Sequence, residues 1–253
     1  MAKSSGSLDR RLGSLSGNSQ SGQRTLADQA FASLHEAVLG GVLLPGERLP
    51  IEDIAKALGM SPMPVREALR RLDSVGLVEH VPHRGARVSE LSLEDLTEVY
   101  EARLALEVLA VRHAAERGDD AQLAAATAAL AELERGGSRA KERGWAAHTA
   151  FHFALYQASG SSWLVRLIQP LWESSERYRR SQATRGRFDL RPGEHEEILN
   201  ATVAGQAPRA AALMHNHLAT TANILAAQMG EEHELFPLVR VPAGARSRAK
   251  RAK

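Results

Sequence analysis

The 253-residue sequence contains no cysteine. Disulfide bonds, thiolate metal ligands and a cysteine nucleophile are therefore excluded, and the composition fits a cytoplasmic protein. No apolar run approaches the roughly 20 residues that a membrane-spanning helix requires. The N-terminus also lacks the apolar core of a signal peptide. We therefore expect a cytoplasmic chain with no membrane partner.

Several signatures of enzymes are also missing. The sequence has no His-Glu-x-x-His metalloprotease motif, no nucleophile elbow, no phosphate-binding glycine loop and no dinucleotide-binding fingerprint. Charge of one sign is not in large excess either, because 32 Lys and Arg residues offset 30 Asp and Glu residues, for a net charge of +2. Any DNA binding must therefore come from a local basic patch.

A helix-turn-helix pattern begins at residue 51. Residues 51–58 are predicted to form a short amphipathic helix, and Gly59 follows at the sharp turn. Ser61 is expected to cap a second helix. The first turn of that helix tolerates Pro62 and Pro64, because the leading amides of a helix have no internal partner. This order of helix, turn and helix is typical of DNA-binding domains.

The second helix of this pair has an apolar face and a cationic face. Val65, Leu69 and Leu72 recur at intervals of four and three, which predicts one buried stripe. An exposed cationic face suits DNA phosphates and base edges. The basic residues outside the stripe are Arg66, Arg70 and Arg71. We therefore predict that this is a DNA recognition helix.

The flanking segments complete a winged helix-turn-helix. Residues 26–39 carry apolar side chains at helical spacing, which predicts a further helix. Short strands are predicted at residues 76–80 and 86–89, joined by a turn at residues 82–85. We expect residues 24–90 to form this domain. Residues 1–23 are rich in Ser and Gly, which predicts a disordered arm.

Three segments resemble the N-terminal domain of GntR-family transcriptional regulators. They are Pro45-Gly46-Glu47-Arg48-Leu49, Pro64-Val65-Arg66-Glu67-Ala68-Leu69 and Gly76-Leu77-Val78. The resemblance implies binding to a double-stranded DNA operator, and a homodimer would read that operator as a palindrome. The expected DNA-contacting residues are Arg48, Ser61, Met63, Arg66, Arg70, Arg84 and Gly85.

Two positions depart from the pattern of this family. Many relatives have a basic residue where Pro62 stands and a small hydroxyl residue where Met63 stands. Pro62 offers no hydrogen-bond donor, and Met63 offers apolar contact, for example to a thymine methyl group. We therefore expect a base preference that differs from that of most relatives.

From Ser92 onward the sequence predicts helices and no strand. Ser92 with Asp95 resembles a capping box. The expected helices cover residues 92–117, 121–135, 139–158, 162–183 with a bend at Pro170, 194–204 and 208–228. The fold class is therefore mainly α, with the winged helix-turn-helix followed by an antiparallel bundle of about six helices at residues 91–230. This second domain is expected to bind an effector and to dimerise.

Residues 231–253 are predicted to form a basic C-terminal tail. Residues 239–253 contain six Lys and Arg residues and no acidic residue. A tail of this kind is either simply solvated or adds non-specific affinity for DNA phosphates. The sequence leaves both alternatives open.

Four histidines are expected to lie in the interior of the bundle. His148 and His152 are four residues apart and share a helix face, a spacing that lets two imidazoles reach one ion. His217 continues an inward apolar stripe, and His195 begins its helix. Each histidine alone could be an ordinary polar residue. Four imidazoles in one core, however, would be costly without a shared cation.

A second resemblance concerns these histidines. Phe151-His152, Glu194-His195-Glu196-Glu197-Ile198 and Met214-His215-Asn216-His217-Leu218 occur in the order seen in the FCD effector domain of the FadR subfamily. The resemblance implies a divalent metal held by an acidic residue and three histidines, and here His148 replaces the acid. Four neutral imidazoles favour zinc, with nickel or copper as alternatives, over magnesium.

The same resemblance implies a small organic acid as effector. Arg103 is the candidate clamp, because a guanidinium matches a carboxylate with two hydrogen bonds. Arg103 could instead form a salt bridge to an acidic neighbour such as Glu101 or Glu107. Ser161 stands where many relatives have asparagine and is the second candidate effector contact.

The sequence therefore predicts a regulator whose affinity for DNA is modulated by a metal and a small carboxylate. One alternative is a regulator that senses the metal itself, and another is an ion that only ties the helices together. A metal-dependent hydrolase, with Glu194 or Glu196 as general base, is a further alternative. A hydrolase would not need a winged helix, so we predict that the chain is not an enzyme.

Overall fold

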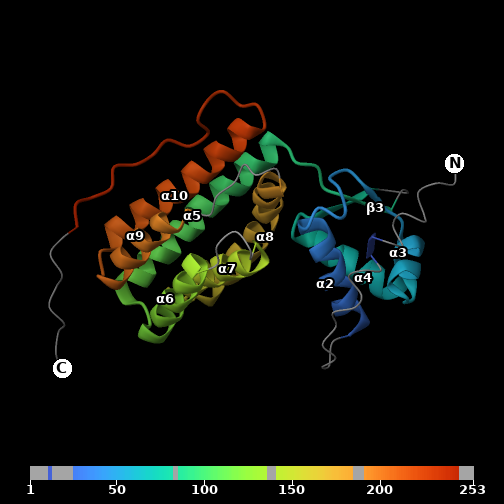
Figure 1. The fold of residues 1–253 in the computed structure, drawn as a ribbon, viewed down its shortest axis with the longest axis horizontal. Helices are drawn as coiled ribbons and strands as arrows, with labels where there is room; N and C mark the ends of the chain where they lie inside the picture. The colour runs from blue at the N-terminus through green and yellow to red at the C-terminus, as the bar shows by residue number, and fades with distance from the viewer. Residues whose placement is uncertain (1–10, 13–24, 82–84, 136–140, 185–190, 245–253) are drawn as a thin grey trace. The chain divides into compact units, whose positions relative to one another are not determined.

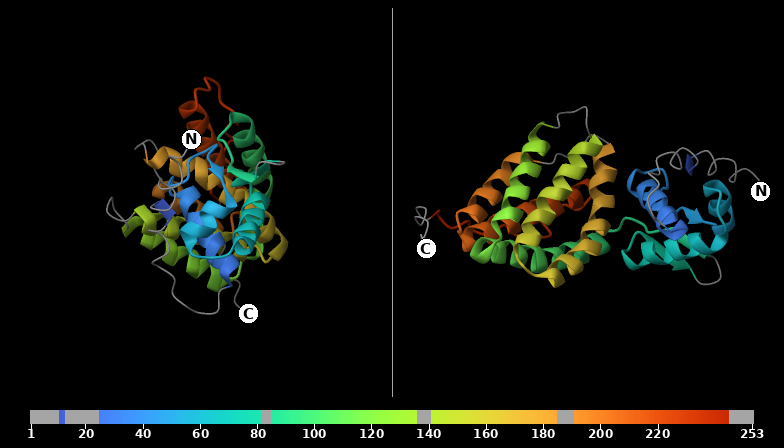
Figure 2. Two further views of the ribbon diagram at one scale, coloured as in Figure 1. Left: turned by 90° about the vertical axis from the view of Figure 1, so that its right-hand side faces the viewer. Right: turned by 90° about the horizontal axis from the view of Figure 1, so that it is seen from below.

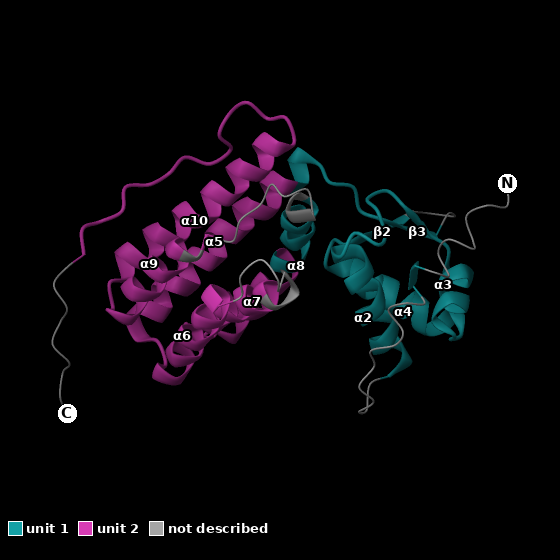
Figure 3. Cartoon of the chain, viewed as in Figure 1, with its two compact units in different colours: residues 1–95, 172–188 teal, residues 96–171, 189–253 magenta. Residues whose placement is uncertain are grey.

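The computed structural model describes residues 11–12, 25–81, 85–135, 141–184 and 191–244. It divides into two compact units, which are coloured separately in Figure 3. The first unit comprises Met1–Asp95 with Trp172–Phe188, and the second comprises Leu96–Leu171 with Asp189–Lys253. Helices α2 to α10 and strand β3 are labelled in Figure 1.

The first unit contains the predicted winged helix-turn-helix. Its elements are α2 (Leu26–Leu39), β1 (Arg48–Leu49), α3 (Ile51–Leu58), α4 (Pro62–Ser74), β2 (Val78–Val81) and β3 (Gly85–Val88). α2 begins at a capping box, in which the Thr25 hydroxyl accepts from the Asp28 amide at 3.1 Å and the Asp28 carboxylate accepts from the Thr25 amide at 3.2 Å. α3 ends at Gly59, whose φ of 65° is left-handed and suits glycine.

The three strands form an antiparallel sheet in the order β1-β3-β2. Ala86 of β3 pairs with Leu49 on one side and with His80 on the other. The two wing strands lie within two residues of their predicted positions. β1 was not predicted, because two residues are too few to show an alternating pattern.

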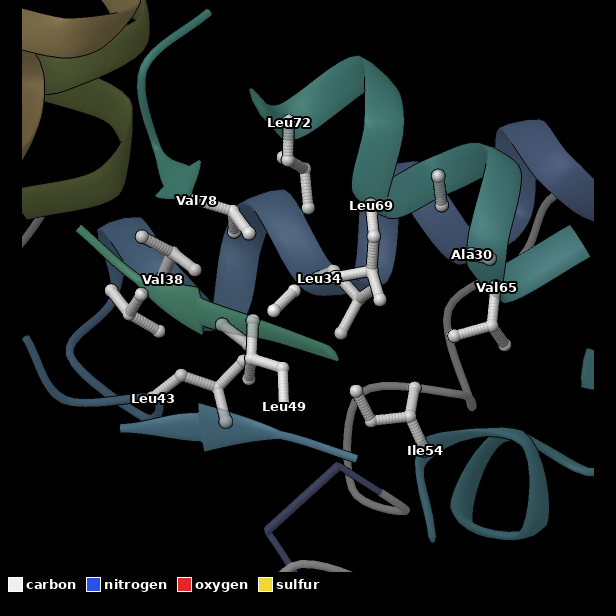
Figure 4. Packing of buried hydrophobic residues seen from close by; sticks show 14 of the residues in the cluster. Ala30, Leu34, Val38, Leu43, Leu49, Ile54, Val65, Leu69, Leu72 and Val78 are labelled. Atoms are coloured by element: carbon white, nitrogen blue, oxygen red, sulfur yellow. The ribbon is translucent and has the colours of Figure 1, made fainter. Parts of the chain in front are cut away.

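Apolar side chains from these elements form one core (Figure 4). The predicted stripe of the recognition helix is confirmed, since Val65, Leu69 and Leu72 are all buried in this core. Leu12 is buried in it as well, and Arg11 forms two 3.0 Å hydrogen bonds with Glu47. The predicted disordered arm is therefore wrong for these two residues. The rest of residues 1–23 lies outside the described residues.

The second part of the chain is helical, as predicted. Its helices are α5 (Leu93–Arg117), α6 (Asp120–Arg135), α7 (Lys141–Ala158), α8 (Ser162–Thr184), α9 (Pro192–Val203) and α10 (Ala207–Gln228). α6 packs against α7 and α9, and α9 packs against α10. Figure 2 shows these helices in two further views. Among the described residues, no helix has the length and apolar character needed to cross a membrane.

The expected helix limits are close to the observed ones. The Ser92 hydroxyl accepts from the Asp95 amide at 3.1 Å, as in the predicted cap. The Asp95 carboxylate, however, accepts hydrogen bonds from Arg177 and Tyr178 of α8. The predicted start of the third helix at residue 139 lies outside the described residues.

The described part of the C-terminal segment is hydrogen-bonded to α10, which the sequence did not predict. Residues 231–244 run back along α10 (Figure 1). The side chains of Asn223 and Asn216 each donate one hydrogen bond to the main chain of this segment and accept one from it, as the main chain of a neighbouring strand does. Asn223 donates to the Phe236 carbonyl at 2.9 Å and accepts from the Phe236 amide at 3.1 Å. Asn216 does the same with Val239, at 2.9 and 2.8 Å. We call residues 231–244 the C-terminal strap.

The spacing of these bonds explains why the strap follows the helix. Arg209, which donates to the Pro242 carbonyl at 2.9 Å, precedes Asn216 and Asn223 at intervals of seven residues. Seven helical residues rise about 10.5 Å. Three residues of extended chain span about 10 Å, and the three held strap residues are three apart. The two repeats therefore stay in register. The remaining tail residues, 245–253, lie outside the described residues.

We predict that Asn223→Ala destabilises the helical unit. The substitution leaves the main-chain groups of residues 235 and 236 without their partner, which costs about 1–3 kcal/mol. Urea unfolding should show this loss, and limited proteolysis should cut the strap faster. Asn200→Ala, at an exposed position on α9, is the control. Equal stability and equal cutting of the two variants would show that the strap is not held by Asn223.

Candidate functional site

The structure brings the four predicted histidines together. His148 and His152 come from α7, His195 from the first turn of α9 and His217 from the middle of α10. Each offers a ring nitrogen, and these four atoms all lie within 4.8 Å of one another. All four residues are buried. Such a group of converging imidazoles is the donor set of a transition-metal site.

The outer ring nitrogens of two histidines have partners that only accept hydrogen bonds. His195 Nδ1 lies 3.1 Å from the Arg191 carbonyl oxygen. His217 Nδ1 lies 2.8 Å from a carboxylate oxygen of Glu194. Because neither oxygen donates, each Nδ1 carries the proton. The lone pair of each neutral ring is therefore on Nε2.

The third histidine reaches the same state through a tyrosine. His152 Nδ1 lies 3.0 Å from the Tyr156 hydroxyl, and that hydroxyl donates its single proton to Glu107 of α5. The hydroxyl can therefore only accept from His152, which places the proton of His152 on Nδ1 as well. Nε2 of His152 is left as an acceptor.

These assignments make the centre of the cluster a place for a cation. His152 Nε2 and His195 Nε2 are 3.1 Å apart, yet both are acceptors, so no proton joins them. Burial lowers the pKa of His195 well below its usual range, which keeps that ring neutral at neutral pH. Zinc bound at about 2.0–2.1 Å in tetrahedral geometry separates its nitrogen ligands by about 3.3 Å. The residues present therefore fit a divalent metal.

Arg191 organises the site, although nothing in the sequence singled it out. Its φ of 46° is left-handed, and it directs the carbonyl oxygen to His195. Its guanidinium donates to Glu194 at 3.0 Å and so also supports His217. The only local signal was Pro192, which marks the start of a helix. A left-handed arginine cannot be foreseen from such a signal.

Glu194 is a partner of a histidine and an arginine in this structure. Burial raises the pKa of the Glu194 carboxyl. Its two oxygens are nevertheless hydrogen-bonded to Arg191 and His217. The carboxylate is therefore not a free general base. Glu196, the other candidate base, is exposed.

The two predicted effector contacts have partners within the chain. Arg103 is buried and donates to both carboxylate oxygens of Glu107, at 2.6 and 3.2 Å, which is the alternative salt bridge. Through Glu107 and Tyr156 it is connected to His152. Ser161 directly precedes α8, and its hydroxyl accepts from the Leu164 amide at 3.3 Å. Among the residues that the structure describes, hydrogen bonds connect Arg103, but not Ser161, to the histidine cluster.

The recognition helix and the wing share a pocket. It has a volume of about 320 Å³ and is lined by residues that include Arg66, Arg70 and His80 beside the start of the wing strand at Gly85. Three of the predicted DNA contacts, Arg66, Arg70 and Gly85, therefore meet on one surface. Arg48 on β1 is exposed but does not line this pocket.

The start of α4 differs from the prediction that Ser61 caps this helix. Ser61 is the N-cap residue, but its side chain makes no capping hydrogen bond. The usual donors are the amides of the second and third helical residues, and here the third is Pro64, which has no N–H. Met63 is 71% exposed at this end of the helix. Arg84 lies outside the described residues.

Arg71 does not belong to the exposed cationic face. It donates to Asp28 of α2 at 2.7 Å, and its guanidinium lies 4.2 Å from the centre of the Phe31 ring. It therefore joins α4 to α2. The exposed basic residues of the recognition helix are Arg66 and Arg70.

Comparisons with known families match both parts of the chain. Residues 26–88 match the model described as bacterial regulatory proteins, gntR family. Residues 98–220 match the FCD domain. The first match covers the winged helix-turn-helix, and the second begins in α5 and contains all four histidines of the cluster.

Individual proteins give the same result. The chain is 30% identical over 210 residues to the HTH-type transcriptional regulator BphR of Paraburkholderia xenovorans, an alignment covering 80% of this chain and 86% of that protein. It is 28% identical over 202 residues to the HTH-type transcriptional repressor GlaR of Escherichia coli, covering 76% and 92%. The solved structure of E. coli McbR/YncC is similar, with a TM-score of 0.69 and 25% identity, and the match covers 82% of this chain and 100% of that one.

We predict that His152, His195 and His217 carry their proton on Nδ1 in the metal-free protein. Nitrogen-15 NMR of the imidazole rings at neutral pH distinguishes this tautomer from the Nε2–H form. The assignment can be made by replacing each histidine in turn. His233, which is 89% exposed at its side chain and lies near only Glu231 through Nδ1, is the solvent-exposed reference among the described histidines. An Nε2–H signal from His195 would contradict the bond to the Arg191 carbonyl.

Proposed function

The chain belongs to the GntR family of bacterial transcriptional regulators and carries an FCD domain, and we propose that it is a ligand-responsive DNA-binding regulator whose helical domain binds a divalent metal and a small carboxylate. The observation that carries the metal is the convergence of Nε2 acceptors from different helices on one buried point. The relatives are transcriptional regulators, not enzymes, which sets the hydrolase alternative aside.

The donor set favours zinc, with nickel as the alternative. His148, His152, His195 and His217 would hold the ion as neutral imidazoles. Bound there, the metal supplies a Lewis-acidic centre that can accept a carboxylate oxygen of a ligand. The protein's own contribution is to fix the rings, through Arg191, Glu194 and Tyr156.

A small carboxylate suits the charges around this site. Arg103 is the proposed second anchor, because its guanidinium already holds a carboxylate, that of Glu107, with two hydrogen bonds. Ser161 is retained as a proposed contact from the resemblance to the family. A ligand bound in this way could change affinity for DNA only by favouring one arrangement of the protein over another.

On the DNA side we propose a homodimer that reads a palindromic operator. A single winged helix makes few base contacts, and two related by a two-fold axis double them. Arg66, Arg70 and Gly85 would face the DNA from one surface, because they line the same pocket. Met63 would offer apolar contact at the leading end of α4, and Arg48, Ser61 and Arg84 complete the proposed set.

We predict that zinc stabilises the metal-free protein and that His152→Ala removes this effect. A ligand present at 100 times its dissociation constant adds about 2.7 kcal/mol, which for a protein of this size raises Tm by roughly 5–10 °C. Thermal unfolding with zinc, nickel and magnesium checks both the effect and the order of metals. His233→Ala, an exposed histidine outside the cluster, should respond as the wild type does. A response to magnesium equal to that for zinc would argue against the imidazole site.

The same preparations separate effector sensing from metal sensing. Affinity for operator DNA is measured with and without chelator, and then with a panel of small carboxylates. Effector sensing requires that a carboxylate changes DNA affinity only when the metal is present, and that DNA changes carboxylate affinity by the same factor. Metal sensing requires that metal alone changes DNA affinity. A metal that stabilises the fold while nothing alters DNA binding would make the ion structural.

We predict that Arg66→Ala weakens operator binding by about 5- to 150-fold, which corresponds to a loss of about 1–3 kcal/mol. Arg66 is exposed on the recognition helix, so the fold should remain intact. Fluorescence anisotropy with a labelled operator measures the effect. Arg112→Ala, an exposed arginine on α5, is the matched control. If both variants bind as tightly as the wild type, Arg66 does not contact the DNA.

A further inference from the structure

A continuous chain of buried hydrogen bonds runs from α5 to the histidine cluster. Arg103 donates to Glu107, Tyr156 donates to the same carboxylate, and His152 Nδ1 lies 3.0 Å from the Tyr156 hydroxyl. Arg103, Glu107 and His152 are each at most 1% exposed, and Tyr156 is fully buried. The chain therefore joins a buried guanidinium to a ring whose other nitrogen faces the proposed metal.

Each link of this chain fixes the direction of the next. Glu107 can receive hydrogen bonds from Arg103 and Tyr156 together because a carboxylate has several acceptor sites. The Tyr156 hydroxyl has one proton, and Glu107 takes it. His152 must then donate to Tyr156 and present the Nε2 lone pair to the cluster. The tautomer of His152 is thus determined by a carboxylate with which it has no direct bond.

Stability alone does not account for these residues. Burying an ion pair such as Arg103 and Glu107 costs several kcal/mol per ion in desolvation, which the attraction between the charges often fails to recover. The pair is fully enclosed, and its carboxylate also holds Tyr156. Outer partners of metal-binding histidines commonly set ring orientation and basicity in this way.

We propose that Glu107 and Tyr156 are positioning residues for the metal centre and that they couple it to the occupancy of Arg103. The proposal rests on the function proposed above. A carboxylate ligand that bonds to Arg103 competes with Glu107 for the guanidinium. The strength of the hydrogen bond that Glu107 accepts from Tyr156 then changes. The strength of the hydrogen bond between Tyr156 and His152 changes with it. Carboxylate and metal therefore alter each other's affinity reciprocally.

The first test measures zinc affinity of the full-length protein by competition with a chromophoric chelator. Tyr156→Phe removes the hydroxyl and should weaken zinc binding by about 10- to 100-fold. Tyr100→Phe is the matched control. Tyr100 is a fully buried tyrosine of α5, and its hydroxyl has no hydrogen-bond partner among the residues that the structure describes. Equal zinc affinity of Tyr156→Phe and wild type would overturn the positioning role.

The second test reads the tautomer of His152 without any metal. Nitrogen-15 NMR of metal-free Tyr156→Phe should show His152 shifting toward the Nε2–H form, while His195 and His217 keep theirs. If wild type binds no zinc but this shift occurs, the proposed function fails while the positioning of His152 stands. If wild type binds zinc and the tautomer of His152 does not change, the positioning proposal fails alone.

A further variant keeps the test valid if Tyr156→Phe folds poorly. Glu107→Gln retains an oxygen that can accept from Tyr156 but removes the charge that pairs with Arg103. We expect it to weaken zinc binding less than Tyr156→Phe does, and to reduce the effect of acetate or succinate on zinc affinity. An unchanged effect of these carboxylates in Glu107→Gln would show that occupancy of Arg103 is not coupled to the metal centre.

Discussion

The helical domain depends on how its buried imidazoles are hydrogen-bonded on their outer side. A buried polar group without a partner is costly, and here the partners come from three different sources: a main-chain carbonyl at Arg191, the carboxylate of Glu194 and the hydroxyl of Tyr156. Each satisfies Nδ1 and leaves Nε2 as an acceptor. The same bonds that make the histidines tolerable in a core therefore also aim their lone pairs at one point. α5, α7, α9 and α10 are held together around that point.

α10 illustrates how closely this site is tied to the periphery of the domain. His217 faces the cluster, whereas its neighbour Asn216 holds the C-terminal strap on another side of the same helix. Adjacent helical residues are about 100° apart, so one helix can serve both. The strap fixes the outer side of α10 through groups spaced seven residues apart. A displacement of α10 would therefore have to break bonds to the strap as well as contacts in the cluster.

The features that could be predicted from the sequence are those that the local spacing of residues determines. The stripe of Val65, Leu69 and Leu72 and the pairing of His148 with His152 follow from helical periodicity, and both are observed. The features that were missed depend on partners far along the chain or on an unusual backbone. Arg191 needs its left-handed φ, and the strap needs Asn223 at the right height on α10. The prediction that the Ser61 side chain caps α4 was wrong for a local reason, because Pro64 has no amide N–H to donate.

The resemblance to the FCD domain implies an acidic ligand where His148 stands, and the proposed site with His148 in that place has a consequence for charge. In the proposed site the two carboxylates stand behind the histidines: Glu194 contacts His217 directly, and Glu107 lies behind Tyr156, which contacts His152. Each carboxylate is already paired with an arginine, Glu107 with Arg103 and Glu194 with Arg191. The charges of these four side chains cancel, so they leave the two positive charges of a bound metal uncompensated. A buried dication in that state is unfavourable. An anionic ligand that reaches the metal relieves it, and a site of four neutral imidazoles therefore favours a carboxylate effector more strongly than one with an acidic ligand of its own.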